Sequence, residues 1–484
     1  MRKDKLLSGL LLSGILTVLL TGCGADSSES TENNGSAGNV QNGESAESIS
    51  ITWAMPQEQY QWTNLDENAS YLNKVLAEDG YPYQLSVLPL EPASYDAIVE
   101  NGGAEGVDIL SLGAGGGGGT VSTPQKVLEA GVLCDINDYL HSAEGSGLYN
   151  AFYEKLWEGV TIDGKVCVIP NQLGQNGTDY AAFRRDIFGD EVSWDGTVKG
   201  IFELAEQAEI PEDMLPVLWG ASLLDISVSL GYEYYDGLFV SLEDGSCHFP
   251  YQTEILLDTY GLMNEWHRSG RLQQRLYDKA FIAQKNYAIW VNWEWNAPRE
   301  EVAEEYVFLQ FPYTFGTRIN GGIGVCESSS HREAALELLT LLFTEERYAN
   351  ALVWGEPGVI YELKDGFAEY LDPDQEGSLI LTSLLTGIFD LAYPGRSDDF
   401  PVNRRDTKWS LYGTEAEKES WTAGRLPDIS DIQSELAALT ALSQEYEDVW
   451  EAEDMAAALE EANRRYEELG GDRIAAELER LLNE

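Results

Sequence analysis

Cysteine and histidine are scarce in this chain, which narrows the chemistry open to it. Its 484 residues include five cysteines and four histidines. The histidines are scattered, and no H-E-x-x-H or C-x-x-C motif supplies the ligand spacing of a zinc site. We therefore expect no metal and no other cofactor. An extracytoplasmic location would permit disulfides. We nevertheless expect free buried thiols at the four widely spaced cysteines Cys134, Cys167, Cys247 and Cys326.

Basic residues are few relative to acidic ones. The sequence has 30 Lys and Arg against 83 Asp and Glu, which gives a formal net charge of −53. Such a chain repels nucleic acid and anionic lipid headgroups, and it disfavours anionic ligands unless a local basic pocket intervenes. The charge also promotes solubility, so it does not by itself indicate a site.

The chain has only one long apolar run, close to its amino terminus. A basic segment, "RKDK", precedes the apolar stretch 6–20, which is shorter than the roughly 20 residues of a membrane span. The following "LLTGC" resembles the lipobox of bacterial lipoproteins, in which the peptide is cut before an acylated Cys. We expect residues 1–22 to be a signal peptide and Cys23 to carry lipid at the outer face of the cytoplasmic membrane. The alternative is an ordinary cleaved signal.

Residues 23–48 have the composition of a tether. They contain no aromatic side chain and, apart from Val40, no large aliphatic one. Such a segment cannot bury enough surface to offset the entropy of ordering, so we expect it to be disordered. A coil of this kind reaches roughly 25–30 Å.

From residue 49 onward the sequence is typical of a large α/β body of two domains. Hydrophobic residues make up 43% of the chain and aromatic residues 11%, enough for sizeable cores. Alternating apolar patterns predict strands over 48–55, 83–90, 107–112, 286–293 and 306–313, and helices over 68–80, 94–103, 253–272 and 332–343. This alternation predicts parallel sheets, whose ligands bind beyond the carboxyl ends of the strands. Beyond Pro427 the sequence becomes helix-rich.

The stretch "VDILSLGAGGGGGT" raises the question of nucleotide binding. Its glycines fit G-x-G-x-x-G after a predicted strand, and Asp135 lies 22 residues beyond Gly113, near where a dinucleotide-binding fold has its ribose acid. However, Gly119 stands where a phosphate-binding loop has its Lys, and a run of five glycines fits the pattern by composition. We predict instead that Gly115 and Gly116 let the backbone approach a ligand closely. The alternative is a solvent loop.

An ordered series of segments resembles the extracellular solute-binding lipoproteins of ABC importers, in particular the sugar-type (family 1-like) branch of Gram-positive bacteria. The segments are "LNKVLAEDGYPYQLSV", "VDILSLG", "GVLCDINDYL", "LWEGVTIDGKVCVIPN" and "HREAALELLTLLFTEERYANALVWGEPGVIYEL". They cover most of residues 49–365, and no single one is unique to the family.

The resemblance implies a two-lobed, clam-like α/β fold, as in periplasmic binding proteins. Each lobe would be a mostly parallel sheet flanked by helices, with a helix-rich C-terminal part. Lobe one would comprise 49–170 plus 307–345, and lobe two 171–306 plus 346–484. The chain would cross between the lobes near Pro170, near Pro312 and within 343–354. A monomer would capture its ligand by hinge closure and deliver it to ABC permease subunits, without chemistry on the ligand.

A sugar site needs flat aromatic rings and several polar partners. The candidates that end strands or lie beside the expected crossings are Gln57, Tyr60, Asn171, Gln172, Tyr180, Trp293, Glu294, Trp295, Arg318, Asn320, Trp354 and Arg396. The strongest segment is "WVNWEWNAP", where at least one of Trp293 and Trp295 is expected to contact ligand. Each candidate has an alternative: core packing for the aromatic residues, turn formation for Asn171 and Gln172, and solvent exposure for the arginines.

Three functions remain open on sequence grounds. The first is a carbohydrate receptor, and the second is the same architecture with a peptide or another polar solute as ligand. The third is a surface-anchored glycosidase, which needs two carboxyl groups about 5–5.5 Å apart. Sequence spacing cannot reveal such a pair, and the resemblance favours a receptor that is not an enzyme.

Overall fold

The computed structural model describes residues 48–61, 63–103, 105–112, 124–172, 179–274, 284–292, 305–316, 322–372, 379–393, 395 and 414–484. All of these residues belong to one compact unit. The predictions for residues 1–47, including the signal peptide, Cys23 and nearly all of the tether, lie outside the described residues.

The first sheet is built around the first strand of the body. In strand order it contains β14 (Ile323–Val325), β3 (Ile109–Ser111), β1 (Ile49–Pro56) and β2 (Tyr83–Leu90). β1 pairs in parallel with β2 and β3, and β14 pairs antiparallel with β3. α2 (Leu65–Glu78) and α3 (Pro92–Glu100) make the connections that parallel neighbours require. The predicted βαβαβ pattern is therefore confirmed.

The second sheet is mixed. In strand order it contains β11 (Leu272–Gln274), β7 (Leu215–Gly220), β12 (Tyr287–Asn292), β6 (Tyr180–Arg184) and β13 (Tyr306–Gln310). β7 pairs in parallel with β11 and β12, whereas β6 pairs antiparallel with both β12 and β13. Its helices include α8 (Arg185–Phe188), α9 (Val198–Gln207) and α10 (Glu254–Arg268). The Thr197 side chain caps α9 by accepting a hydrogen bond from the Gly200 amide.

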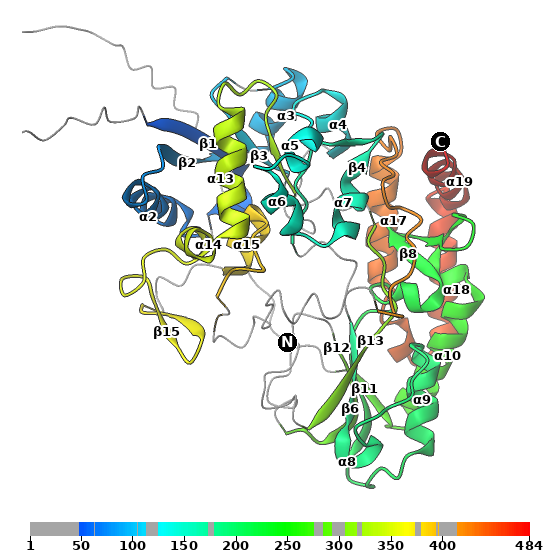
Figure 1. Cartoon of the computed structure of the whole chain (residues 1–484). Helices are drawn as coiled ribbons and strands as arrows, with labels where there is room; N and C mark the ends of the chain where they lie inside the picture. The colour runs from blue at the N-terminus through cyan, green and yellow to red at the C-terminus, as the bar shows by residue number, and fades with distance from the viewer. Residues whose placement is uncertain are drawn as a thin grey trace, which may run out of the picture. The chain divides into compact units, whose positions relative to one another are not determined.

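The C-terminal part is helical, as the sequence predicted. It contains α17 (Gln433–Glu445), α18 (Met455–Glu468) and α19 (Gly471–Leu482), coloured orange to red in Figure 1. α17 and α19 contact a small antiparallel sheet of β8 (Tyr232–Tyr235), β9 (Leu238–Ser241) and β10 (Cys247–His248). α19 is amphipathic, and its apolar face packs into the second hydrophobic core.

Two large hydrophobic cores are present. The first surrounds the first sheet, and the second joins one face of the second sheet to the C-terminal helices, while a small third cluster lies on the other face of that sheet. The helices of the first core between β3 and the first crossing are short: α4 (Pro124–Glu129), α5 (Asn137–Leu140), α6 (Ser146–Asn150) and α7 (Glu154–Val160). α7 runs into the hairpin of β4 (Thr161–Ile162) and β5 (Lys165–Val166).

Two segments pack in a different lobe from the one expected for them. β13 pairs in the second sheet, although 307–345 was expected in lobe one. Conversely, the buried residues from Tyr348 to Ala392 belong to the first core, although 346–484 was expected in lobe two. This stretch comprises α14 (Glu346–Val353), β15 (Tyr361–Lys364), β16 (Phe367–Tyr370) and α15 (Leu379–Thr386), and it follows α13 (Arg332–Thr344).

The reason for the second difference is a long-range contact. α14 packs against α2, and the buried Asn68 side chain donates hydrogen bonds to the carbonyls of Leu352 (2.9 Å) and Val353 (3.1 Å). These bonds satisfy the end of α14 and hold it on the first core. The crossing expected within 343–354 is therefore wrong. The chain instead stays on the first core through Ala392. Ala416 and Leu426 also pack against that core, and Trp421 packs against the second.

Candidate functional site

The carboxyl edge of the second sheet places polar residues in one row. In the strand register, Tyr180 is opposite both Asn292 and Gln310, and Asn292 is also opposite Gly220. Gln274 ends the adjacent strand β11 one position away, opposite Trp219. Ligands of α/β sheets bind beyond this kind of edge, so the row is a candidate ligand surface.

Gln310 is the unusual member of this row. Both its amide nitrogen and its amide oxygen are buried, yet neither has a hydrogen-bond partner among the described residues. An unpaired buried amide costs folding free energy, about 1–3 kcal/mol for each unsatisfied group. The position therefore suits a hydroxyl or amide supplied by a ligand. Gln310 is not among the sequence candidates, although it is the single polar residue that follows the apolar run "YVFL" before Pro312.

Carboxylates lie beside the other end of the row. The Gln274 amide donates a 2.7 Å hydrogen bond to Asp448, and the Ser222 hydroxyl donates one of 3.3 Å to Glu447. Burial raises the pKa of the Glu447 carboxyl, and the neighbouring Asp448 charge raises it further. This part of the edge presents oxygen acceptors, which suit the donor groups of a polyhydroxylated or cationic ligand.

The corresponding edge of the first sheet contains two sequence candidates. β1 continues directly into α1 (Gln57–Tyr60), where Gln57 is exposed and Tyr60 is half-buried. Burial raises the pKa of the Tyr60 phenol, as does the Asp66 carboxylate. Trp53, earlier on β1, is fully buried and donates a 2.8 Å hydrogen bond from its indole to Ser111. Its position therefore favours core packing over ligand contact.

Three other candidates are enclosed. Asn171 and Gln172 are 4% and 3% exposed, and the Gln172 side-chain oxygen accepts the Phe389 and Asp390 amides at 2.8 and 2.9 Å. Trp354 is 2% exposed, its indole donates to the Tyr393 carbonyl at 2.9 Å, and aromatic side chains pack on its ring. Ligand contact by these three side chains would require rearrangement of the surrounding residues.

The remaining candidates stay predictions because they lie outside the described residues. They are Gly115, Gly116, Trp293, Glu294, Trp295, Arg318, Asn320 and Arg396. Tyr180, which is described, is half-buried at the first residue of β6.

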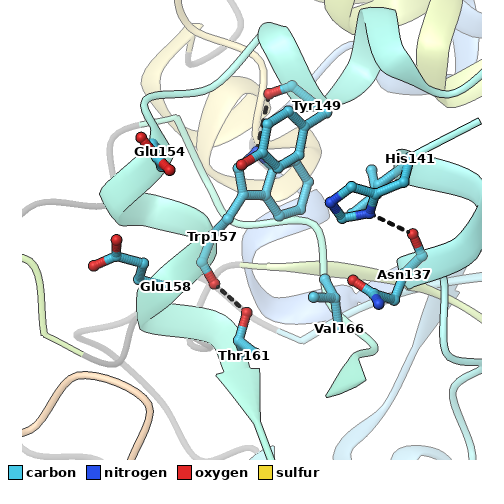
Figure 2. Close-up of a pocket in the computed structure, with 9 residues that line it drawn as sticks. Asn137, His141, Tyr149, Glu154, Trp157, Glu158, Thr161 and Val166 are labelled. Carbon is cyan, nitrogen blue, oxygen red and sulfur yellow. Dashed lines mark hydrogen bonds between the residues drawn. The ribbon is translucent and has the colours of Figure 1, made fainter. Parts of the chain in front are cut away.

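A separate cavity of about 330 Å³ lies between α5 and α7 (Figure 2). Its lining is formed by Asn137, Leu140, His141, Tyr149, Glu154, Trp157, Glu158, Thr161 and Val166. The Tyr149 and Trp157 rings are stacked with centroids 5.9 Å apart, and the Trp157 indole donates to the Tyr149 carbonyl at 3.0 Å. His141 Nδ1 lies 2.8 Å from the Asn137 carbonyl and donates to it, because a carbonyl can only accept. No sequence candidate lines this cavity.

The described residues include no group of three His, Cys, Asp or Glu side chains that could hold a metal ion. Cys134, Cys167, Cys247 and Cys326 are free thiols, as the sequence favoured. Burial raises the pKa of Cys134 to about 11 and the pKa values of Cys247 and Cys326 to about 12. These three thiols therefore stay protonated and are poor nucleophiles at neutral pH. Within the described ranges, no helix is both long and apolar enough to cross a membrane.

Comparison with known proteins identifies the fold by structural similarity, because the sequence comparisons found no match. No protein-family profile matches the sequence, and no curated protein matches it. Among solved structures, an N-glycan transport solute-binding protein from Streptococcus pneumoniae is similar over 90% of this chain and 98% of its own, with 18% identity and a TM-score of 0.57. An ABC-transporter-associated solute-binding protein from Bifidobacterium longum infantis that binds HMO is similar over 90% and 99%, with 11% identity and a TM-score of 0.54. The chain thus has the two-domain α/β fold of ABC-transporter solute-binding proteins.

Proposed function

We propose that this protein is an extracytoplasmic receptor that captures a mono- or oligosaccharide between its two lobes and delivers it to an ABC importer. The supporting observation is the likeness in fold over 90% of the chain. Of the two similar proteins, the one from Streptococcus pneumoniae serves N-glycan transport and the one from Bifidobacterium longum infantis binds HMO. The receptor would act as a monomer and would carry out no chemistry on the ligand.

The polar row on the second sheet is the part of the binding site that we propose first. A sugar hydroxyl both donates and accepts hydrogen bonds, so it could pair either end of the Gln310 amide. Tyr180 lies opposite Gln310 in the register and adds an aromatic ring. From the first sheet we include Gln57 and Tyr60, which follow β1.

Residues outside the described ranges complete the proposed site. Trp293 and Trp295 would supply flat rings, with Glu294 as a hydroxyl acceptor. Gly115 and Gly116 would admit the ligand close to backbone, and Arg318, Asn320 and Arg396 would add donors. We also propose that Cys23 carries the lipid anchor, which mass spectrometry of membrane-derived protein would test directly.

A thermal-shift screen tests the ligand class. The panel comprises neutral oligosaccharides, anionic oligosaccharides, short peptides and polar metabolites. A ligand at 100 times its Kd stabilises the folded state by about 2.7 kcal/mol, which is easily detected. We expect at least one neutral saccharide to raise Tm. A shift with peptides alone would favour the peptide-binding alternative, and chemical conversion of a saccharide would favour the glycosidase.

A further inference from the structure

The cavity between α5 and α7 has an aromatic wall whose rings are held in place by the chain itself. Tyr149 and Trp157 stack with an interplanar angle of 8°, and the Phe152 ring meets Trp157 at 63° with the centroids 5.0 Å apart. The Trp157 indole also donates to the Tyr149 carbonyl at 3.0 Å, so reorienting the indole would break this bond. The His141 ring lies 5.4 Å from the Tyr149 ring and extends the wall. A wall that is already ordered lowers the entropic cost of binding a ligand.

Three hydrogen-bond donors in the lining of this cavity are already engaged within the chain (Figure 2). Besides the indole, the Thr161 hydroxyl donates to the Trp157 carbonyl at 2.7 Å. His141 Nδ1 donates to the Asn137 carbonyl at 2.8 Å, so the neutral imidazole ring offers Nε2 as an acceptor. The Asn137 amide and the Tyr149 hydroxyl can each donate, but each also accepts. The lining is therefore richer in acceptors than in donors.

Two carboxylates add negative charge to the same lining. Glu154 and Glu158 lie four residues apart on α7, which places them on one face of the helix, and both are exposed. Lys155 pairs with Glu158 at 2.8 Å, and it is also attracted by the Glu417 and Glu419 carboxylates. Glu154 has no ion-pair partner among the described residues. One lysine therefore faces several carboxylates, and the net charge beside the cavity is negative.

We infer that this cavity is a second ligand site, which binds an organic cation: a guanidinium or ammonium group on an apolar stem. The cation lies against the wall of Tyr149 and Trp157 and pairs with Glu154, because Tyr and Trp rings and carboxylates both attract positive charge. Leu140 and Val166 supply apolar surface for the stem. The volume of about 330 Å³ is at the lower end of the range of ligand pockets, so the cavity suits a small cation or a single side chain. The same chemistry serves a free amine or guanidine and an arginine side chain of a partner protein.

Titration with butylguanidinium, with the neutral isostere butylurea as its control, tests the ligand class. Because so acidic a chain attracts any cation, the binding must also be localised. With isotope-labelled tryptophan, the NMR signal of the Trp157 indole N–H, assigned through Trp157→Phe, should shift saturably with butylguanidinium and stay in place with butylurea. Glu154→Gln should weaken binding about threefold, since an exposed ion pair is lost. Glu209→Gln removes the same charge at an exposed position after α9, and it should leave the Kd unchanged.

A short arginine peptide, capped at both ends, distinguishes the two sources of the cation. Tighter binding of the peptide than of butylguanidinium would identify a side chain of a partner protein as the ligand, and the reverse order would identify a free cation. An unmoved Trp157 signal, equal shifts with butylurea, or equal losses of affinity in Glu154→Gln and Glu209→Gln would overturn the inference. No residue that lines the cavity belongs to the proposed saccharide site. The saccharide screen and this titration can therefore fail independently.

Discussion

Gln172 holds Phe389 across 217 residues of sequence, because its side-chain oxygen accepts the Phe389 amide at 2.8 Å. The same oxygen accepts the Asp390 amide at 2.9 Å. Gln172 is the last described residue before the first crossing, and these bonds tie it to the loop after α15.

Replacing Gln172 by Leu should therefore destabilise the fold. Two buried backbone donors would lose their partner, with an expected cost of about 1–3 kcal/mol in the free energy of unfolding. Urea denaturation would measure this, with Gln84→Leu on the exposed face of β2 as a control within about 0.5 kcal/mol of the wild type. Unchanged stability together with lost ligand binding would instead identify Gln172 as a ligand residue.

Gln310→Leu should separate stability from binding. The substitution removes an amide that has no partner, so the ligand-free protein should be as stable as the wild type or slightly more so. Saccharide affinity should fall about tenfold, because the proposed hydrogen bond is lost. Gln274→Leu is the matched control: it breaks the bond to Asp448 and should lower stability. Unaltered affinity in Gln310→Leu would remove Gln310 from the site.

Gly245 should tolerate no side chain. Its φ is +73°, and an added Cβ would lie 2.1 Å from the Trp421 indole. Gly245→Ala should cost about 2–4 kcal/mol, combining backbone strain with overpacking. Gly270→Ala is the control, because φ there is +75° and the added Cβ would meet nothing within 4 Å. That variant should lose only the strain, about 1–2 kcal/mol, in thermal or urea unfolding. Equal losses would contradict the packing at Trp421.

The contribution of Glu447 to the free energy of unfolding should decrease as pH rises. The folded-state pKa of this carboxyl is raised above its usual 4.5, so its stabilising contribution is complete below the unfolded pKa and is lost as pH rises through the folded pKa. Glu447→Gln removes this titration. The variant should therefore gain stability relative to the wild type between pH 4 and pH 7, as measured by urea unfolding at each pH. A constant or opposite difference would refute the assigned shift.

The sequence predicted most elements because their patterns are local. The alternation in Tyr83–Leu90 matches β2 to the residue, and the helical periodicity beyond Pro427 matches the three C-terminal helices. The third crossing was misplaced because α14 is held on the first core by Asn68, far away in the sequence. No local pattern reports such a contact.

The site was harder to predict than the fold. An aromatic residue near the end of a strand or helix can face ligand or core, and Trp53 on β1 and Trp354 after α14 are both enclosed. Gln310 became a candidate only when the register placed it opposite Tyr180 and its amide was found buried without a partner. The glycine-rich loop and the "WEW" segment lie outside the described residues, so their roles remain predictions.

Isothermal titration with the neutral oligosaccharide that most raises Tm tests the central claim most directly. The account predicts saturable binding of one saccharide per chain, recovery of the saccharide unchanged, and weaker binding by Gln310→Leu at unchanged stability. Failure of every saccharide to bind the correctly folded protein would contradict the account.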